Sequence, residues 1–166
     1  MIPPLWDRAV DTVAEFEAAA LQRLNEAELL LKRSRDLAAI YLYGYSVEMR
    51  IKAVYFRNAR PQPQLALPIT RNDRQNAVRM WTTLGLSVKP DGHHIAGWAE
   101  LAVAARLTTP NPYPVGFGNE IVNNAASLYL IWRETLRYWS IIPLSKELRS
   151  VRTIARWFAS HHSKMI

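Results

Sequence analysis

The segment from Leu37 to Arg57 carries ionisable side chains inside an otherwise apolar helical pattern. Glu48 and Lys52 are four residues apart with the acid first, which is the favourable order for an ion pair on one helix face. The other faces of this helix are apolar, and burial of an unpaired charge costs free energy. We therefore expect at least one of Glu48 and Lys52 to point into a cleft rather than into bulk water.

Gly44 lies in the middle of the same segment. Glycine inside a helix costs about 1 kcal/mol relative to alanine, so its presence needs a packing reason. We expect another helix backbone to cross close to this position.

Basic side chains also line one face of the last expected helix. Arg149, Arg152 and Arg156 step by three and four residues, and Lys164 continues the series. Such a stripe could follow a phosphate backbone and would bind nucleic acid with a steep salt dependence. The alternative is a solvent-facing surface whose arginines pair with Glu147 or with acids of the first helix.

The net charge of +7 is concentrated in two segments of the 166-residue chain. Residues 50–79 hold seven basic groups against Asp73 alone, and residues 133–166 hold seven against Glu134 and Glu147. Of the 21 basic residues 16 are arginine, which pairs with phosphate through a planar fork and stacks on bases. RNA or a nucleotide is therefore an expected partner, unless the basic surface is simply solvated. The candidate binding residues are Arg149, Arg152, Arg50, Lys52 and Glu48.

The histidines form two adjacent pairs, His93–His94 and His161–His162, the first near Asp91. Adjacent residues on a helix point about 100° apart and lack the three- or four-residue step of a chelating pair. The chain has no cysteine, and it contains no GxGxxG, phosphate-binding loop, nucleophile elbow or HExxH motif. We expect neither a metal nor a cofactor.

The composition, 49% apolar and 21% charged, is that of an ordinary globular protein, and we expect one domain over residues 1–166. The lack of cysteine fits a reducing compartment. The N-terminal MIPPLWDRAV has no basic leader before an apolar block, and no apolar run approaches the roughly 20 residues that a bilayer requires. A cytoplasmic location without a membrane partner is the resulting expectation.

Apolar residues recur with a helical period over six segments. The first two helices are expected around Phe16–Leu31 and from Ser34, as N-cap, to Pro61 and Pro63. The others are expected over Arg71–Thr83, His93–Leu107, Glu120–Trp139 and Leu148–Phe158. No segment combines two-residue alternation with flanking turn residues, so we predict an all-α, up-and-down bundle of about five or six helices.

The connection over residues 108–119 is unusual because it contains three prolines and two glycines together with Tyr113 and Phe117. Long loops inside compact domains are often binding elements, and both aromatic rings could stack on a base or enter a groove of a partner. The alternative is that both rings fold back and seal one end of the bundle.

Three motifs carry a family resemblance. YLYGYSVEMRIKA, residues 41–53, follows an amphipathic helix and precedes GHHIAGWAEL, residues 92–101, by some forty residues. This arrangement resembles the HEPN (higher eukaryotes and prokaryotes nucleotide-binding) domains. The matching positions are Gly44, Tyr45, Glu48, Lys52 and Ala53 in the second helix, His93 or His94 with Ile95 and Leu101 in the later motif, and the Leu136, Arg137, Tyr138 triplet before the last helix.

The resemblance implies a helical bundle that is usually dimeric and acts in RNA cleavage, nucleotide handling or toxin-antitoxin pairs with nucleotidyltransferases. Active members carry an arginine followed after four to six residues by a histidine, a spacing that Arg156 shares with His161 and His162. In such a site the histidine acts as general acid or base toward the ribose 2′-hydroxyl, and the arginine stabilises the phosphate in the transition state. Trp157 stands where the family usually has a polar residue.

Three functions follow from these observations. The leading one is a HEPN-like homodimer that binds RNA or a nucleotide and acts beside a nucleotidyltransferase in a two-component, toxin-antitoxin type system. The second is a metal-independent ribonuclease toxin of the same fold, in which Arg156 and His161 of two protomers form one catalytic site. The third is a non-catalytic module for protein–protein interaction.

Overall fold

The computed structural model describes residues 11–60, 66–87 and 92–166, and within these ranges the chain is all-α, as predicted. Pro61, Pro63 and Asp91 lie outside the described residues. The helices are α2 (Val13–Leu31), α3 (Asp36–Ala59), α4 (Arg71–Leu84), α5 (Ile95–Leu107), α6 (Phe117–Ile131), the short 3₁₀ helix η2 (Glu134–Tyr138), α7 (Ser145–Ser160) and α8 (His162–Met165).

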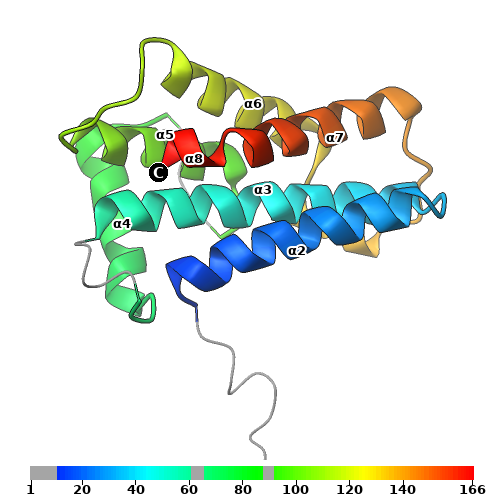
Figure 1. Cartoon of the computed structure of the whole chain (residues 1–166), viewed down its shortest axis with the longest axis horizontal. Coiled ribbons are helices and arrows are strands. Elements are labelled where there is room, and N and C mark those ends of the chain that lie inside the picture. Colours follow the sequence, from blue (N-terminus) through cyan, green and yellow to red (C-terminus); the bar gives the residue numbers. More distant parts are fainter. Residues whose placement is uncertain (1–10, 61–65, 88–91) are drawn as a thin grey trace, which may run out of the picture.

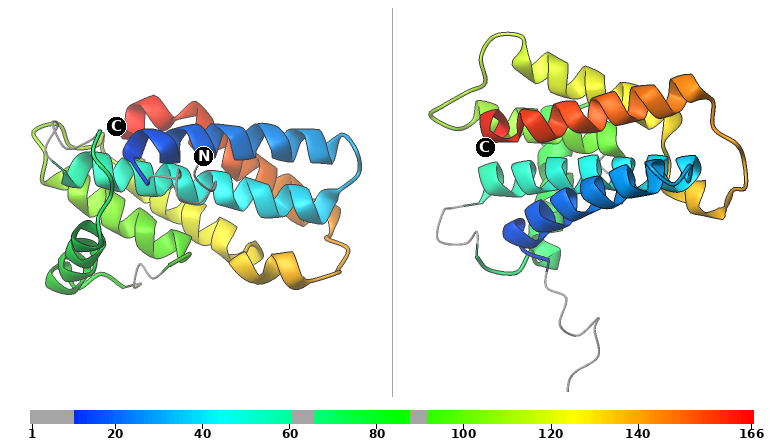
Figure 2. Two further views of the ribbon diagram at one scale, coloured as in Figure 1. Left: turned by 90° about the horizontal axis from the view of Figure 1, so that it is seen from below. Right: turned by 45° about the vertical axis from the view of Figure 1, so that its right-hand side comes forward.

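Helix α3 is the centre of the bundle. It forms an antiparallel hairpin with α2 and also packs against α5 and α7, while α6 closes the bundle by contacting both α5 and α7 (Figure 1). Helix α4 packs on α5 and stands at one end, beside the beginning of α2 (Figure 2). Because α3 has helices around most of its circumference, its sequence is apolar on more than one face.

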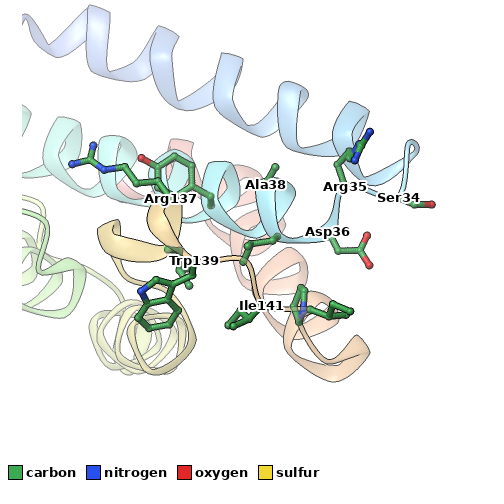
Figure 3. A pocket seen from close by; sticks show the side chains of 12 residues that line it. Ser34, Arg35, Asp36, Ala38, Arg137, Trp139 and Ile141 are labelled. Atoms are coloured by element: carbon green, nitrogen blue, oxygen red, sulfur yellow. The ribbon is translucent and has the colours of Figure 1, made fainter.

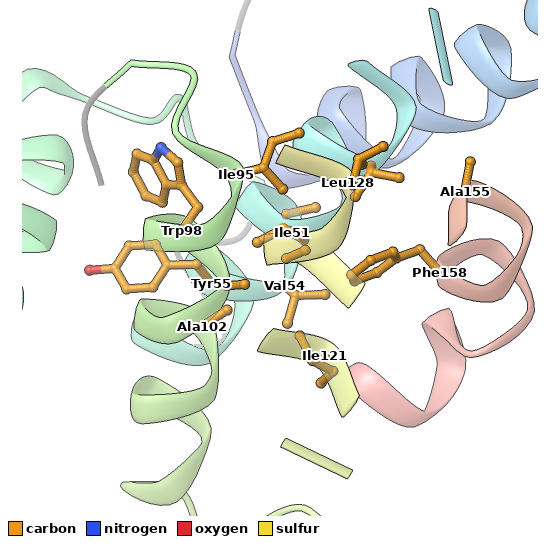
Figure 4. Close-up of a cluster of buried hydrophobic side chains, with 14 of the residues drawn as sticks. Ile51, Val54, Tyr55, Ile95, Trp98, Ala102, Ile121, Leu128, Ala155 and Phe158 are labelled. Carbon is orange, nitrogen blue, oxygen red and sulfur yellow. The ribbon is translucent and has the colours of Figure 1, made fainter. Parts of the chain in front are cut away.

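The core is built from the positions that carry the helical period. Ile51, Val54 and Tyr55 of α3 meet Ile95, Trp98 and Ala102 of α5, Ile121 and Leu128 of α6, and Ala155 and Phe158 of α7 (Figure 4). Burial of such side chains stabilises a fold by about 1.5–3 kcal/mol each, before the cost in conformational entropy. This packing fixes the face of α3 that carries Glu48 and Lys52.

Local signals explain several helix ends. Thr12 caps α2 by accepting the backbone N–H of Glu15, and Thr70 and Asp73 form a capping box at the start of α4. Gly85, with φ at 59°, ends α4 in the left-handed conformation. The expected helix over Arg71–Thr83 is therefore confirmed within one residue.

The expectation that Ser34 caps α3 is wrong. Ser34 itself adopts the left-handed conformation, with φ at 54°, and the N-cap position is Arg35, which makes no capping hydrogen bond. The chain reverses between α2 and α3 within four residues, and this tight turn removes Ser34 from the extended backbone that a side-chain cap requires.

The expected helix over Glu120–Trp139 is wrong in its second half. Helix α6 ends at Ile131, Trp132 is extended, and the chain continues into η2. The fully buried indole of Trp132 lies against Gly44 and donates its Nε1–H to the carbonyl oxygen of Tyr41 at 3.0 Å. A methyl group at Gly44 would overlap this indole, so the close neighbour of Gly44 is a side chain and not the expected helix backbone.

Candidate functional site

Glu48, Lys52 and His93 form a charged cluster that joins α3 to the segment before α5. The carboxylate of Glu48 is fully buried. Its Oε1 accepts a hydrogen bond from Nζ of Lys52 at 2.6 Å, and both carboxylate oxygens lie 3.0 Å from Nδ1 of His93. The structure thus confirms that Glu48 and Lys52 pair, and it adds a histidine from 45 residues later.

The adjacent histidines His93 and His94 make different contacts. His94 is the N-cap of α5, where its Nδ1 accepts the backbone N–H of Gly97 at 3.2 Å, and its ring lies 3.9 Å from that of Tyr129, centroid to centroid. His93 instead faces Glu48 across the cluster. Of the two histidines that could match the later family motif, His93 is therefore the one that contacts the family-like residues of α3.

The contacts of His93 define its chemistry. A carboxylate accepts hydrogen bonds, so we assign the proton between the two groups to Nδ1 of His93, which leaves Nε2 as the nitrogen available to a ligand. The His93 side chain is 43% exposed, whereas that of Lys52 is 15% exposed. The Lys52 ammonium also lies 5.4 Å from the Trp98 ring centroid, within range of a cation–π interaction.

These residues line a cleft of about 500 Å³ between the start of α2, α3, α4 and the start of α5. That volume lies within the range of small-molecule sites, roughly 300–1,000 Å³. Aromatic and aliphatic side chains form much of the lining, and an ion pair between Arg74 and Asp11 lies at its edge. The apolar lining residues are Phe16, Met49, Phe56, Val78 and Trp98.

Arg50, expected to bind a ligand, does not line this cleft. It is buried, its Nε has no hydrogen-bond partner among the described residues, and burial lowers the pKa of its guanidinium. Glu17 of α2 and His162 of α8 are its ionisable neighbours, and burial together with the charge of Arg50 lowers the pKa of His162, which favours the neutral imidazole. Arg50 therefore belongs to the packing between α2, α3 and the C-terminus.

The arginine stripe of α7 is divided between two surroundings. Arg152 and Arg156 both bind the carboxylate of Glu28 on α2, which is one of the alternatives that the sequence left open. Arg149 is exposed and lines a groove of about 490 Å³ between α6 and α7, together with Lys146. Within the described ranges Arg149 has neither an ion pair nor a hydrogen bond through its side chain.

Arg156 and His161, the pair with the ribonuclease-like spacing, contact different elements. Arg156 faces Glu28 of α2. The ring of His161 stacks on Trp157 at 4.6 Å, and its Nδ1 lies 2.9 Å from the Trp157 carbonyl oxygen, so this nitrogen donates to it. No contact within one chain joins the two side chains in the described part of the structure.

Tyr113 and Phe117 fold back onto the bundle, as in the second of the two interpretations of their loop. The Tyr113 hydroxyl donates to the carbonyl oxygen of Met165 at 2.7 Å, and burial raises the pKa of Tyr113 to about 12. Phe117 is buried between Tyr113 and Trp157. Both rings therefore seal the end of the bundle near the C-terminus.

Another groove, of about 580 Å³, lies at the opposite end of α3 between the α2–α3 turn and the segment after η2 (Figure 3). Arg35 and Asp36 line one side, and Trp139, Ile141 and other apolar residues line the other. Ile142, which also lines the groove, is 93% exposed, and Tyr138, which lies between the lining residues Arg137 and Trp139 in the chain, is 73% exposed.

The sequence pattern did not single out Glu28 as the partner of the α7 arginines, or Trp98 as a lining residue of the cleft. A signal for Glu28 exists, because Glu17 and Glu28 are eleven residues apart, or about three helical turns, and so share one face of α2. Both acids pair with basic side chains of other helices, Glu17 with Arg57 and Glu28 with the two arginines of α7.

In comparisons with known proteins, no family model, no curated protein and no solved structure matches this chain. Over the described ranges, no helix has both the length and the apolar character that a membrane span requires. In the same ranges, no three histidine, aspartate or glutamate side chains are grouped so that they could hold a metal ion.

Proposed function

We propose that the protein binds a nucleotide, free or at an accessible position of an RNA chain, in the cleft formed around Glu48. The observation that carries the proposal is the fully buried Glu48 carboxylate, which holds Lys52 and His93 in the wall of a cleft of about 500 Å³. The resemblance to HEPN domains involves the same residues.

A buried carboxylate contributes little net stability to a protein, because it must be removed from water. Removal of an ion from water costs several kcal/mol even in real proteins, and a well-packed apolar side chain often serves stability equally well. A buried charge with specific partners in a cleft is therefore a candidate for function. Here Glu48 fixes the positions of a cation and an imidazole, and both can contact a phosphate.

The remaining surface of the cleft suits the rest of a nucleotide. The partly exposed Phe16 offers aromatic surface on which a base or sugar can pack, and the buried Phe56 and Trp98 add to the apolar wall behind it. Arg74 adds a second cation at the edge, although Asp11 pairs with it in this structure. The cleft thus combines apolar lining with a small number of polar groups, as nucleotide sites do.

Binding can be tested with His93→Ala. A nucleoside monophosphate and a short single-stranded RNA are titrated by calorimetry into the wild type and the variant. Loss of one charge-assisted hydrogen bond corresponds to about a tenfold weaker affinity. His161→Ala is the matched control, because His161 stacks on Trp157 and does not line the cleft. Equal affinities of all three proteins, or no binding by the wild type, would reject the proposal.

The expected nucleotidyltransferase partner is proposed from the resemblance alone. The chemistry of the cleft is compatible with it, because a nucleotidyltransferase handles nucleotides. Co-purification of the two proteins from a strain that expresses both genes, if the neighbouring open reading frame encodes such an enzyme, is the corresponding test.

A second candidate function, an interaction module, is favoured by the large groove beside η2. We propose that it receives a second copy of this chain, in agreement with the expected homodimer. Arg35 and Asp36 are adjacent on its rim, so across a twofold axis each arginine can face the aspartate of the other copy (Figure 3). The exposed Ile142 and Tyr138 supply apolar surface for such an interface.

Sedimentation velocity over a concentration series tests this second candidate. Ile142→Asp places a charge in the apolar surface and should shift a dimer toward monomer, whereas Val115→Asp, at an equally exposed position in another loop, should not. A monomeric wild type at high concentration would contradict the dimer.

A further inference from the structure

Glu28 of α2 binds two arginines of α7 at once. Arg152 donates from Nε to Oε1 at 3.1 Å and from Nη2 to Oε2 at 2.7 Å. Arg156 donates from Nε to Oε1 at 2.9 Å and from Nη2 to Oε2 at 3.0 Å. A single carboxylate thus accepts four hydrogen bonds from two parallel forks.

This arrangement is the one by which arginine pairs hold phosphate. A guanidinium has five N–H donors in a planar fork that matches both carboxylate and phosphate oxygens. Two guanidinium groups on one carboxylate leave a net charge of +1. The hydrogen bond from Arg152, and to a lesser extent that from Arg156, lowers the pKa of Glu28 to about 2. The carboxylate therefore stays charged at all physiological pH values.

The two arginines are also accessible. The side chain of Arg156 is 55% exposed and that of Arg152 is 37% exposed, so several of their N–H donors face solvent. Arg149, one turn away toward the helix N-terminus, is exposed as well, but it lines the groove between α6 and α7. A phosphate could approach this face of α7 from solvent without any opening of the core.

We infer that Arg152 and Arg156 form a phosphate-binding site in which Glu28 acts as an internal counter-ion that competes with the ligand. The ligand chemistry is a phosphate group, whether inorganic or part of an RNA backbone. The site uses none of the residues that line the cleft around Glu48, so it goes beyond the proposed function and stands or falls separately.

Competition by Glu28 has a direct consequence. When its charge is removed, the two guanidiniums lose their internal acceptor and the site becomes free for an external anion. Glu28→Gln should therefore bind phosphate more tightly than the wild type, by about tenfold if one charge-assisted contact is gained by the ligand.

Glu26→Gln is the matched control. It removes the same charge from the same helix, but Glu26 pairs with Arg23 and Gln22 of α2 and not with α7. Any general effect of net charge on polyanion binding is therefore common to both variants, and the gain expected for Glu28→Gln alone measures release of the arginine pair.

Two ligands distinguish the source of the phosphate. Inorganic phosphate and a single-stranded RNA of about twelve nucleotides, a length within the roughly 4–16 nucleotides that small single-strand sites cover, are each titrated by calorimetry at fixed ionic strength. A gain with both ligands identifies a site for single phosphates, and a gain with RNA alone identifies a backbone site. Equal affinities of Glu28→Gln and Glu26→Gln for both ligands overturn the inference.

A measurement on the wild type covers the case in which Glu28→Gln does not fold. Titration with the same RNA is followed through the arginine Nε–H resonances by NMR. We expect shifts at Arg152 and Arg156 and none at Arg57, which is paired in a similar way with Glu17 but is 27% exposed. Unchanged Arg152 and Arg156 resonances at an RNA excess that saturates the protein contradict the inference.

Discussion

The carboxylate of Glu48 and Nδ1 of His93 lie 3.0 Å apart, although the two residues are 45 positions apart in the chain. Glu48 is buried and His93 is the accessible member of the pair. The contact orients the imidazole and leaves Nε2 for a ligand, in the same way that a carboxylate fixes the tautomer of a histidine in many enzyme and metal sites. The proposed nucleotide site in the adjoining cleft rests on this contact.

Lys52→Met should destabilise the protein more than the loss of an ordinary surface charge. The variant leaves the buried Glu48 carboxylate with His93 as its remaining described partner. We expect a loss of about 2–3 kcal/mol in the free energy of unfolding, below the 3–5 typical of fully buried pairs because Lys52 is partly exposed. Urea denaturation measures it. Arg23→Met, which breaks the exposed pair with Glu26, should cost less than about 1 kcal/mol, and equal losses would contradict the account.

Gly44→Ala should also be destabilising, because the added methyl group overlaps the buried indole of Trp132. Overpacking of a rigid core costs about 1–3 kcal/mol, and we expect a value near the upper end. Gly92→Ala is the control, since a methyl group there meets no atom of the described residues within 4 Å. Thermal unfolding of both variants decides the point, and a Gly44→Ala protein as stable as Gly92→Ala would show that Trp132 does not occupy this position.

Stability should depend on pH through Glu28. The pKa of Glu28 is lowered from 4.5 to about 2, chiefly by the hydrogen bond from Arg152, so its contribution is complete above about pH 5 and is lost as the pH falls toward 2. The ion pairs are largely solvated, and we therefore expect only about 1–2 kcal/mol. Denaturation curves between pH 2 and 7 should show a stability difference between wild type and Glu28→Gln at neutral pH that shrinks toward pH 2. A constant difference would contradict the depressed pKa.

RNA integrity separates the binding proposal from the ribonuclease alternative. A ribonuclease that uses Arg156 and His161 of two protomers should cleave RNA in the presence of EDTA, and His161→Ala should abolish cleavage. Arg156 is paired with Glu28, and His161 with the Trp157 carbonyl oxygen. We therefore expect the wild type and His161→Ala each to bind the RNA and to leave it uncleaved. Gel electrophoresis of RNA recovered from the protein measures this, and cleavage that depends on His161 would favour the toxin instead.

Local patterns predicted most of the helices, because helical period and capping are encoded within a few residues. The Glu48–Lys52 pair was also predictable, since its spacing of four residues requires only that the segment be helical. The end of α6 was not, because the apolar period continues past Trp132 and only the tertiary contact with Gly44 explains the break.

Contacts between distant segments account for what the sequence could not give at the site. The sequence pattern left His93 and His94 as equal candidates for the histidine of the later motif. The structure distinguishes them, because His94 caps the beginning of α5 and His93 does not. Arg50 illustrates the opposite case: its charge predicted a ligand contact, but α3 is enclosed by other helices on that face, so the side chain is buried.

The most direct test of the central claim is to follow the imidazole ¹⁵N resonances of the wild-type protein during titration with a nucleoside monophosphate. We predict that Nε2 of His93 shifts progressively and saturates, while the resonances of His161 stay unchanged. Saturable binding that leaves His93 unshifted, or the absence of any binding, would contradict the assignment of the cleft around Glu48 as a nucleotide site.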